Sequence, residues 1–90
     1  MILNKSYTVK GRVQGVWFRH FTQKEAEKRS LSGFVMNQED GSVYIEVSGE
    51  AKYVDLFSEW VNSGSPLSIV EEVICKDIEN SHEGKFLIKS

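Results

Sequence analysis

Cysteine and proline are scarce in this chain of 90 residues, where each occurs once, as Cys75 and Pro66. A single cysteine cannot form a disulfide within the chain, and it cannot supply a cysteine-rich zinc site. We therefore expect a fold that is stabilised by its core alone, in a reducing, cytoplasmic setting. The proline falls in the segment 62–66 (Asn-Ser-Gly-Ser-Pro), which is the only clear breaker cluster of the chain.

Long apolar runs and an excess of basic residues are also missing. No stretch approaches the ~20 apolar residues that cross a membrane, and residues 1–6 do not resemble the apolar segment of a signal peptide. The chain has 11 Lys and Arg against 13 Asp and Glu, a formal net charge of −2. A protein that binds nucleic acid usually carries a basic stripe, and none is present. We expect neither membrane nor nucleic acid as a partner, and any anion site must be built locally.

What is present is enough apolar material for one domain, which we expect to span residues 1–90. Hydrophobic residues make up 40% of the chain and aromatic residues 11%. A chain of this size buries roughly 60–68% of its unfolded surface. Such a core needs no covalent staple, and we expect the domain to be a monomer.

The spacing of apolar residues predicts alternating strands and helices. In chain order, the predicted elements are a strand at 6–13, a helix at 16–29, strands at 33–38 and 42–48, a helix at 50–62, a strand at 69–78 and a short last strand at 85–89. Two strand–helix–strand units joined by a hairpin turn at 39–41 are typical of an α+β fold. We predict a ferredoxin-like, split β-α-β arrangement (β-α-β-β-α-β with a short extra C-terminal strand). Two helices would pack on one face of an antiparallel sheet, and the other face would be partly exposed.

Two short runs carry the residues that are suited to chemistry. In residues 11–19, an alternating strand leads through a glycine turn into a helix, with Arg19 in its first turn. Glycine lets backbone N–H groups converge, the helix N-terminus adds free donors, and arginine adds a charged fork of donors. In residues 33–37, Asn37 places an amide at the end of an apolar strand. Together the two runs predict a site for a small phosphorylated substrate.

The two runs, together with three residues that follow the second one, carry a family resemblance. The residues concerned are Gly11, Val13, Gln14, Gly15, Val16, Phe18 and Arg19, followed by Gly33, Phe34, Val35, Asn37, Gly41, Val43 and Gly49. In order and spacing they resemble the two signatures of the acylphosphatase family. Two multi-residue signatures at the right separation are far more specific than a lone glycine motif.

The resemblance implies an enzyme that hydrolyses the carboxyl-phosphate bond of small acyl phosphates to a carboxylate and inorganic phosphate, without metal, cofactor or phosphoenzyme. It implies that Arg19 binds phosphate and that Asn37 orients the attacking water, so these are the candidate catalytic residues. The candidate phosphate-binding loop consists of Gln14, Gly15, Val16, Trp17, Phe18 and Arg19. Inorganic phosphate is the expected product and inhibitor. Acetyl phosphate, carbamoyl phosphate, the mixed anhydride of phosphoglycerate and a protein-bound aspartyl phosphate all remain candidate substrates.

A second interpretation is a non-catalytic module, since the same fold also serves as a small-ligand or protein-binding domain. Trp17 could line the mouth of the pocket or cover the start of the helix. His20 is expected to point away from the loop, and His82 to lie in a solvated turn. Ser30 stands where a glycine usually ends the first helix, so this helix end is expected to be less stable.

Overall fold

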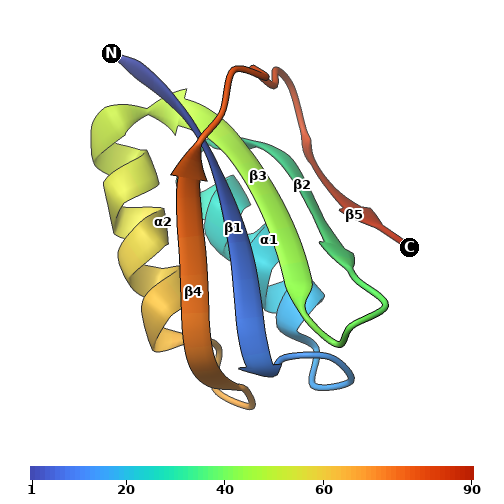
Figure 1. Cartoon of the computed structure of the whole chain (residues 1–90). Coiled ribbons are helices and arrows are strands. Elements are labelled where there is room, and N and C mark those ends of the chain that lie inside the picture. Colours follow the sequence, from blue (N-terminus) through green and yellow to red (C-terminus); the bar gives the residue numbers. More distant parts are fainter.

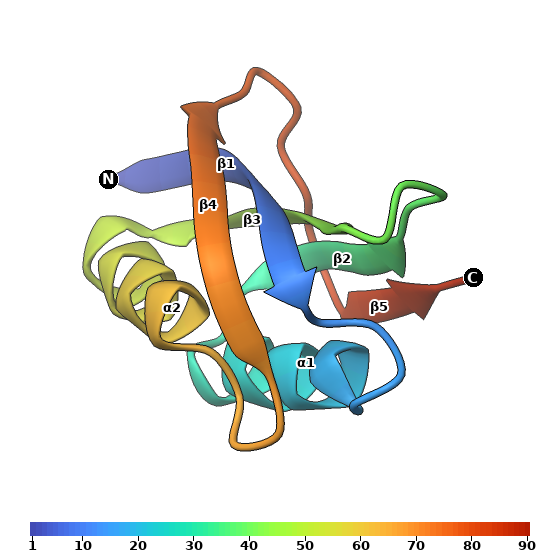
Figure 2. The same cartoon turned by 60° about the horizontal axis from the view of Figure 1, so that its bottom comes forward.

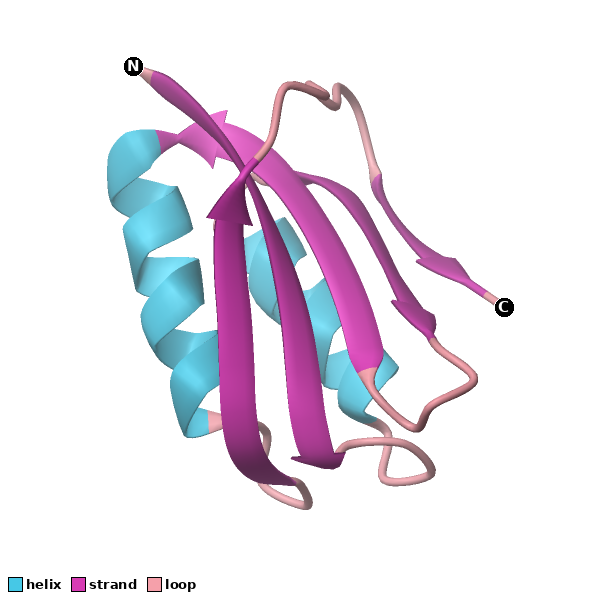
Figure 3. Ribbon diagram, viewed as in Figure 1, coloured by secondary structure: helices cyan, strands magenta, loops and turns pink.

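The computed structural model describes all of residues 1–90 and contains two helices and a five-stranded sheet (Figure 1). In chain order, the elements are β1 (Ile2–Arg12), α1 (Phe18–Lys28), β2 (Ser32–Asn37), β3 (Val43–Glu50), α2 (Ala51–Ser63), β4 (Ile69–Asp77) and β5 (Phe86–Lys89). Both helices cover the same face of the sheet (Figure 3). The predicted ferredoxin-like order with a short extra C-terminal strand is confirmed.

The strand order in the sheet is β4-β1-β3-β2-β5. The first four of these strands pair antiparallel, as predicted. Strand β5 instead lies parallel to β2, with Phe86 opposite Gly33. The chain reaches this position because residues 78–85 carry it from β4 at one edge of the sheet to the far edge (Figure 1). The complete sheet is therefore mixed.

The core lies between the sheet and the helices and follows from the alternation along the strands. The buried apolar residues are Tyr7, Val9, Val13, Phe18, Ala26, Leu31, Val35, Val43, Ile45, Val47, Val54, Phe57, Val61 and Phe86. The rings of Tyr7 and Phe57 meet edge to face with centroids 5.6 Å apart, which joins the sheet to α2. The Tyr7 hydroxyl also pairs with Ser58 Oγ at 2.5 Å. This packing fixes the face of the sheet on which the helices lie.

Strand β1 begins at Ile2, earlier than the predicted start at residue 6. The N-terminal residues pair with the far end of β3, where Ile2 lies opposite Glu50. The amide of Ala51 also donates to the carbonyl oxygen of Met1 at 2.9 Å. These contacts join residues far apart in the chain, so local periodicity does not reveal them.

The sheet face away from the helices is partly covered by residues 78–85. The backbone amide of His82 donates to Ser48 Oγ at 2.8 Å, and its Nε2 lies 2.7 Å from Glu46 Oε1. Its ring also meets the ring of Phe34 edge-on, with centroids 5.6 Å apart. Glu46 and Ser48 are therefore only 8% and 3% exposed. The prediction of a solvated turn is wrong for His82, because this segment folds back onto the sheet.

Candidate active site

The segment between β1 and α1 forms a loop with two residues in the left-handed backbone region. Val13 anchors its start and is only 1% exposed. Gly15 has φ 75°, and Trp17 has φ 65° and ψ 18°. This conformation costs a residue other than glycine roughly 1–2 kcal/mol. Because Trp17 is not helical, α1 begins at Phe18 and not at the predicted Val16.

The backbone amides of residues 14–20 donate to no acceptor of the protein. The first turn of α1 has neither a side-chain cap nor an acidic residue. In most helices such groups satisfy the free N–H donors of the first turn. Here the donors stay open at the positive end of the helix, which is an arrangement that binds anions.

Gln14 fixes this loop to the neighbouring hairpin. Its Nε2 donates to the carbonyl oxygens of Gln38 and Ser42 at 2.8 Å each, in the turn between β2 and β3. The side chain thus holds the loop beside the end of β2 while its backbone amide remains free. Gln14 was predicted to belong to the loop, but these two hydrogen bonds were not predicted, because the acceptors lie 24 and 28 residues further along the chain.

A cleft of about 480 Å³ opens between the β1–α1 loop, the end of β2 and strand β5. Its lining residues are Val13, Gly15, Trp17, Phe18, Arg19, His20, Asn37 and Ile88. Figure 2 shows the β1–α1 loop, the β2–β3 turn and the C-terminal end of β5 on the same side of the molecule. Segments from the beginning, middle and end of the chain therefore form one site.

Arg19 and Asn37 lie in this cleft, and each has hydrogen-bonding atoms that no other part of the protein uses. Arg19 is half-buried, and its Nη1 donates to the carbonyl oxygen of Lys89 at 3.0 Å. No carboxylate pairs with it, so the rest of its five-donor fork can bind a ligand. The Oδ1 atom of Asn37 is buried and accepts no hydrogen bond from the protein. A buried acceptor of this kind normally has a partner.

The structure brings most of the predicted site residues together and separates a few. The side chains of Gln14 and Val16 do not line the cleft. His20 does line it, so the expectation that it points away from the loop is wrong. Its ring packs edge-on against that of Trp17, with centroids 6.3 Å apart. Ile88 was not predicted at the site, because the place of β5 beside β2 depends on pairing between distant segments.

Fold and cleft define a small ferredoxin-like protein with an open polar site at one end of its sheet. The family model described as Acylphosphatase matches residues 5–88. An acylphosphatase of Mannheimia succiniciproducens is 44% identical over 81 residues, which cover 90% of each chain. The crystal structure of acylphosphatase from Bacillus subtilis has a TM-score of 0.89 and 40% identity over the whole of both chains. An acylphosphatase structure from Coxiella burnetii has a TM-score of 0.92 and 32% identity, covering 98% of this chain and 93% of that one.

The chain belongs to the acylphosphatase family and is therefore an enzyme, a hydrolase. None of its helices has the length and apolar character needed to cross a membrane. No group of three or more His, Cys, Asp or Glu side chains is arranged to hold a metal ion.

Proposed function

We propose that this protein hydrolyses small acyl phosphates to a carboxylate and inorganic phosphate, using Arg19 and the amides of residues 14–20 to hold the phosphoryl group. Phosphoryl transfer passes through a loose transition state with charge spread over three equatorial oxygens. Fixed amides and a guanidinium can stabilise that charge without reorganising. We also propose that the protein acts as a monomer, the default for so small a domain.

Asn37 is the residue to which we assign the attacking water. Its Oδ1 can accept a hydrogen bond from the water, and its amide nitrogen can donate to a phosphoryl oxygen. The water oxygen bonds to phosphorus while the bond from phosphorus to the acyl oxygen breaks, and the carboxylate leaves with the electron pair. The cleft contains no carboxylate that could accept a proton. We assign one water proton to a phosphoryl oxygen of the substrate, and the other stays on the oxygen that is now bonded to phosphorus.

The strongest support for this proposal is that three kinds of unsatisfied hydrogen-bonding group share one cleft. A row of unused amides, a guanidinium without a carboxylate and a buried acceptor without a partner occur in one cleft. In a site that only stabilised the fold, the buried acceptor of Asn37 would normally have a partner within the protein. A bound phosphoryl group with its water would satisfy all three.

The direct test follows acyl-phosphate hydrolysis by ultraviolet absorbance, with and without a chelator. We expect turnover that the chelator does not reduce and that inorganic phosphate inhibits competitively. Phosphate should also raise the melting temperature, because a ligand at about 100 times its Kd stabilises the folded state by about 2.7 kcal/mol.

The alternative function is a binding module with the same anion cradle. It predicts that phosphate raises the melting temperature while no acyl phosphate is hydrolysed. Both functions would give the unpartnered Oδ1 of Asn37 a hydrogen-bond donor, so turnover is the measurement that separates them. If no acyl phosphate tested is hydrolysed, the proposal is overturned and the binding module remains as the function.

A further inference from the structure

The cleft differs in character between its floor and its rim. Val13 and Phe18 are each 1% exposed and form the floor near Arg19 and Asn37. A phosphoryl group is small, whereas clefts of roughly 300–1,000 Å³ hold whole small molecules. The 480 Å³ of this cleft therefore leaves room beyond the phosphoryl site.

The rim of the cleft is apolar and exposed. Trp17 is 69% exposed and Ile88 is 41% exposed, and both line the cleft. Trp17 covers little of the protein at this exposure, so shielding the helix start does not account for its ring. Its position is nonetheless defined, because the ring packs edge-on against His20. The two rim residues come from distant parts of the chain, and folding places both at the same cleft.

The backbone at Trp17 adds a second, independent observation. Trp17 adopts the left-handed conformation at φ 65°, which glycine or asparagine tolerates better than tryptophan. The exposed ring lies outside the hydrophobic core. Strained positions that the surrounding structure holds in place cluster at ligand sites.

We propose that Trp17 and Ile88 form the binding site for the acyl group, and that the enzyme prefers acyl phosphates whose acyl group presents a flat apolar face. This inference rests on the proposed function, since it assigns the other half of the same substrate. The phosphoryl group lies on the floor, and the acyl group extends toward the rim and packs against the indole. Aromatic contacts of this kind stabilise the complex beyond the area that they bury.

The test compares benzoyl phosphate with acetyl phosphate, which share the reacting bond and differ in the acyl group. The measured quantity is the ratio of their kcat/KM values within each variant, so that any effect on the shared phosphoryl site cancels. We expect Trp17→Asn to lower this ratio about five- to tenfold, mainly through the KM of benzoyl phosphate. Trp17→Phe should keep most of the preference, and Ile88→Ala should lower it by a smaller factor.

Two controls separate the ring from the backbone and from general surface effects. Asparagine tolerates the left-handed conformation, so a loss due to loop shape alone would affect both substrates equally. Leu56→Ala removes an apolar side chain of similar exposure, 39%, from α2 outside the cleft and should leave the ratio unchanged. An unchanged ratio in Trp17→Asn would overturn the inference.

A binding measurement keeps the inference testable without turnover. Calorimetry with phenylphosphonate and methylphosphonate measures the same preference in ligands that are not hydrolysed. We expect phenylphosphonate to bind more tightly to the unmodified protein and to lose that advantage in Trp17→Asn. If no acyl phosphate is hydrolysed but this preference appears, the proposed function fails and the acyl site stands. If hydrolysis occurs and both ligands bind equally, the acyl site fails alone.

Discussion

Arg19 and Asn37 share a cleft but are assigned different tasks, and substitutions can separate them. Asn37→Ala should lower kcat about a hundredfold or more, the cost of losing a positioned donor or acceptor in a transition state. It should change inhibition by inorganic phosphate little, because the amides and the Arg19 guanidinium that we propose bind phosphate remain. Arg19→Ala should weaken phosphate inhibition and turnover together. Steady-state kinetics with phosphate as inhibitor measure both effects.

The control for this pair is Asn62→Ala, which removes an exposed asparagine from α2 and should change neither constant. Full activity in Asn37→Ala would remove the water-positioning role. Equal losses of phosphate affinity in Asn37→Ala and Arg19→Ala would show that both residues only hold phosphate.

At the scale of residues, the sequence alone was enough to predict which groups of residues 11–19 and 33–37 lie at the cleft, with the exceptions given above. Arg19 and Asn37 could be assigned to one site because each lies at a position set by its own strand end or helix start. Their roles stay predictions, since geometry alone does not show turnover. The side-chain bonds of Gln14 and the place of Ile88 could not be predicted, because each depends on a contact between distant segments.

At the scale of elements, α1 ends at a left-handed position that glycine usually occupies and that is serine in this chain. The amide of Leu31 donates to the carbonyl oxygen of Ala26 at 2.9 Å, and that of Ser30 to Glu27 at 3.1 Å. This is the hydrogen-bond pattern of a Schellman motif, whose left-handed residue is usually glycine. Here Ser30 occupies it with φ 56°. The motif forms in full, so serine strains it without preventing it.

Ser30→Gly should therefore stabilise the protein by about 1 kcal/mol, since the left-handed conformation costs glycine nothing. For a domain of this size, that gain raises the melting temperature by roughly 4–8 °C. Thermal unfolding followed by circular dichroism measures the shift. The control Ser63→Gly, at the last helical residue of α2, should not raise it. A lower melting temperature in Ser30→Gly would mean that the serine side chain, and not its backbone, decides the cap.

The segment 78–85 gives a second prediction at this scale, through the buried carboxylate of Glu46. Burial alone would raise the pKa of Glu46, but the hydrogen bonds from Tyr44 and His82 outweigh it and hold the pKa below its ordinary value of 4.5. The ionised form is thus favoured by folding. Its contribution to stability is present above the ordinary pKa and is lost as the pH falls through the lowered one.

Glu46→Gln should therefore destabilise the protein at neutral pH and flatten the loss of stability on acidification below about pH 4. Urea unfolding at a series of pH values measures this difference. Glu59→Gln, at an exposed position of α2, is the matched control and should follow the unmodified protein. If the free energy of unfolding fell with pH equally in Glu46→Gln and in the unmodified protein, the Glu46 carboxylate would not contribute to the acid sensitivity.

Element order and type could be predicted because strong periodicity and turn residues are local signals. Most element ends fell within one or two residues of the prediction. The start of β1 is the exception, because it depends on pairing with Glu50. The smaller shift at the start of α1 follows from the left-handed Trp17. The folded-back His82 depends, like β1, on a contact with a distant residue, Glu46.

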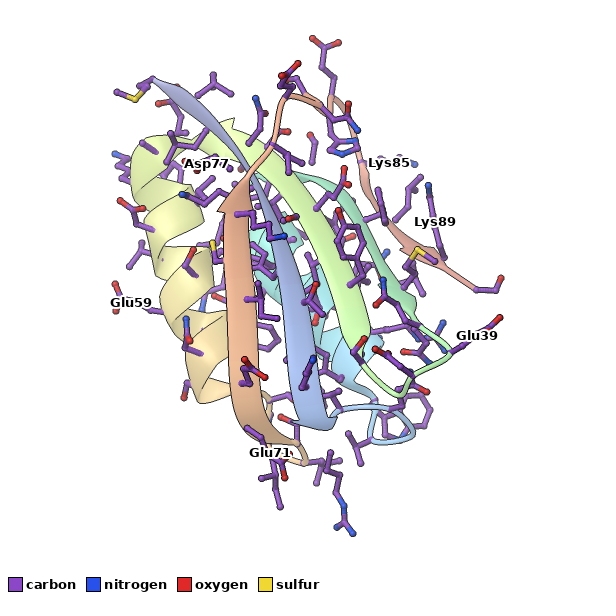
Figure 4. All side chains as sticks on the ribbon, in the orientation of Figure 1. Glu39, Glu59, Glu71, Asp77, Lys85 and Lys89 are labelled. Carbon is purple, nitrogen blue, oxygen red and sulfur yellow. The ribbon has the colours of Figure 1, made fainter.

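At the scale of the whole molecule, charge does not explain an anion site. The charged side chains labelled in Figure 4 are exposed and carry both signs; they are Glu39, Glu59, Glu71, Asp77, Lys85 and Lys89. With a net charge of −2, the molecule as a whole does not attract phosphate. Affinity must come from the local donors at the start of α1, as the composition led us to expect.

The last strand completes both the core and the site, which makes the C-terminal segment the sharpest test of the whole fold. Phe86 on β5 is 2% exposed, whereas its neighbour Leu87 is 51% exposed on the opposite face. Gln23 Nε2 donates to the Phe86 carbonyl oxygen at 3.1 Å, and Arg19 to the carbonyl oxygen of Lys89. Strand β5 is thus bound to α1 as well as to β2.

Phe86→Ala should cost about 3–5 kcal/mol, the range for a buried aromatic residue, while Leu87→Ala should stay within about 0.5 kcal/mol, as for most surface changes. A chain of this size has a total stability of roughly 5–13 kcal/mol. Urea unfolding of Phe86→Ala, followed in parallel by helix circular dichroism and tryptophan fluorescence, should shift both transitions equally. That result would make β5 part of one cooperative unit with the helices. If both transitions stayed in place, β5 would open independently of the core, and the link from Lys89 to Arg19 would break without unfolding the protein.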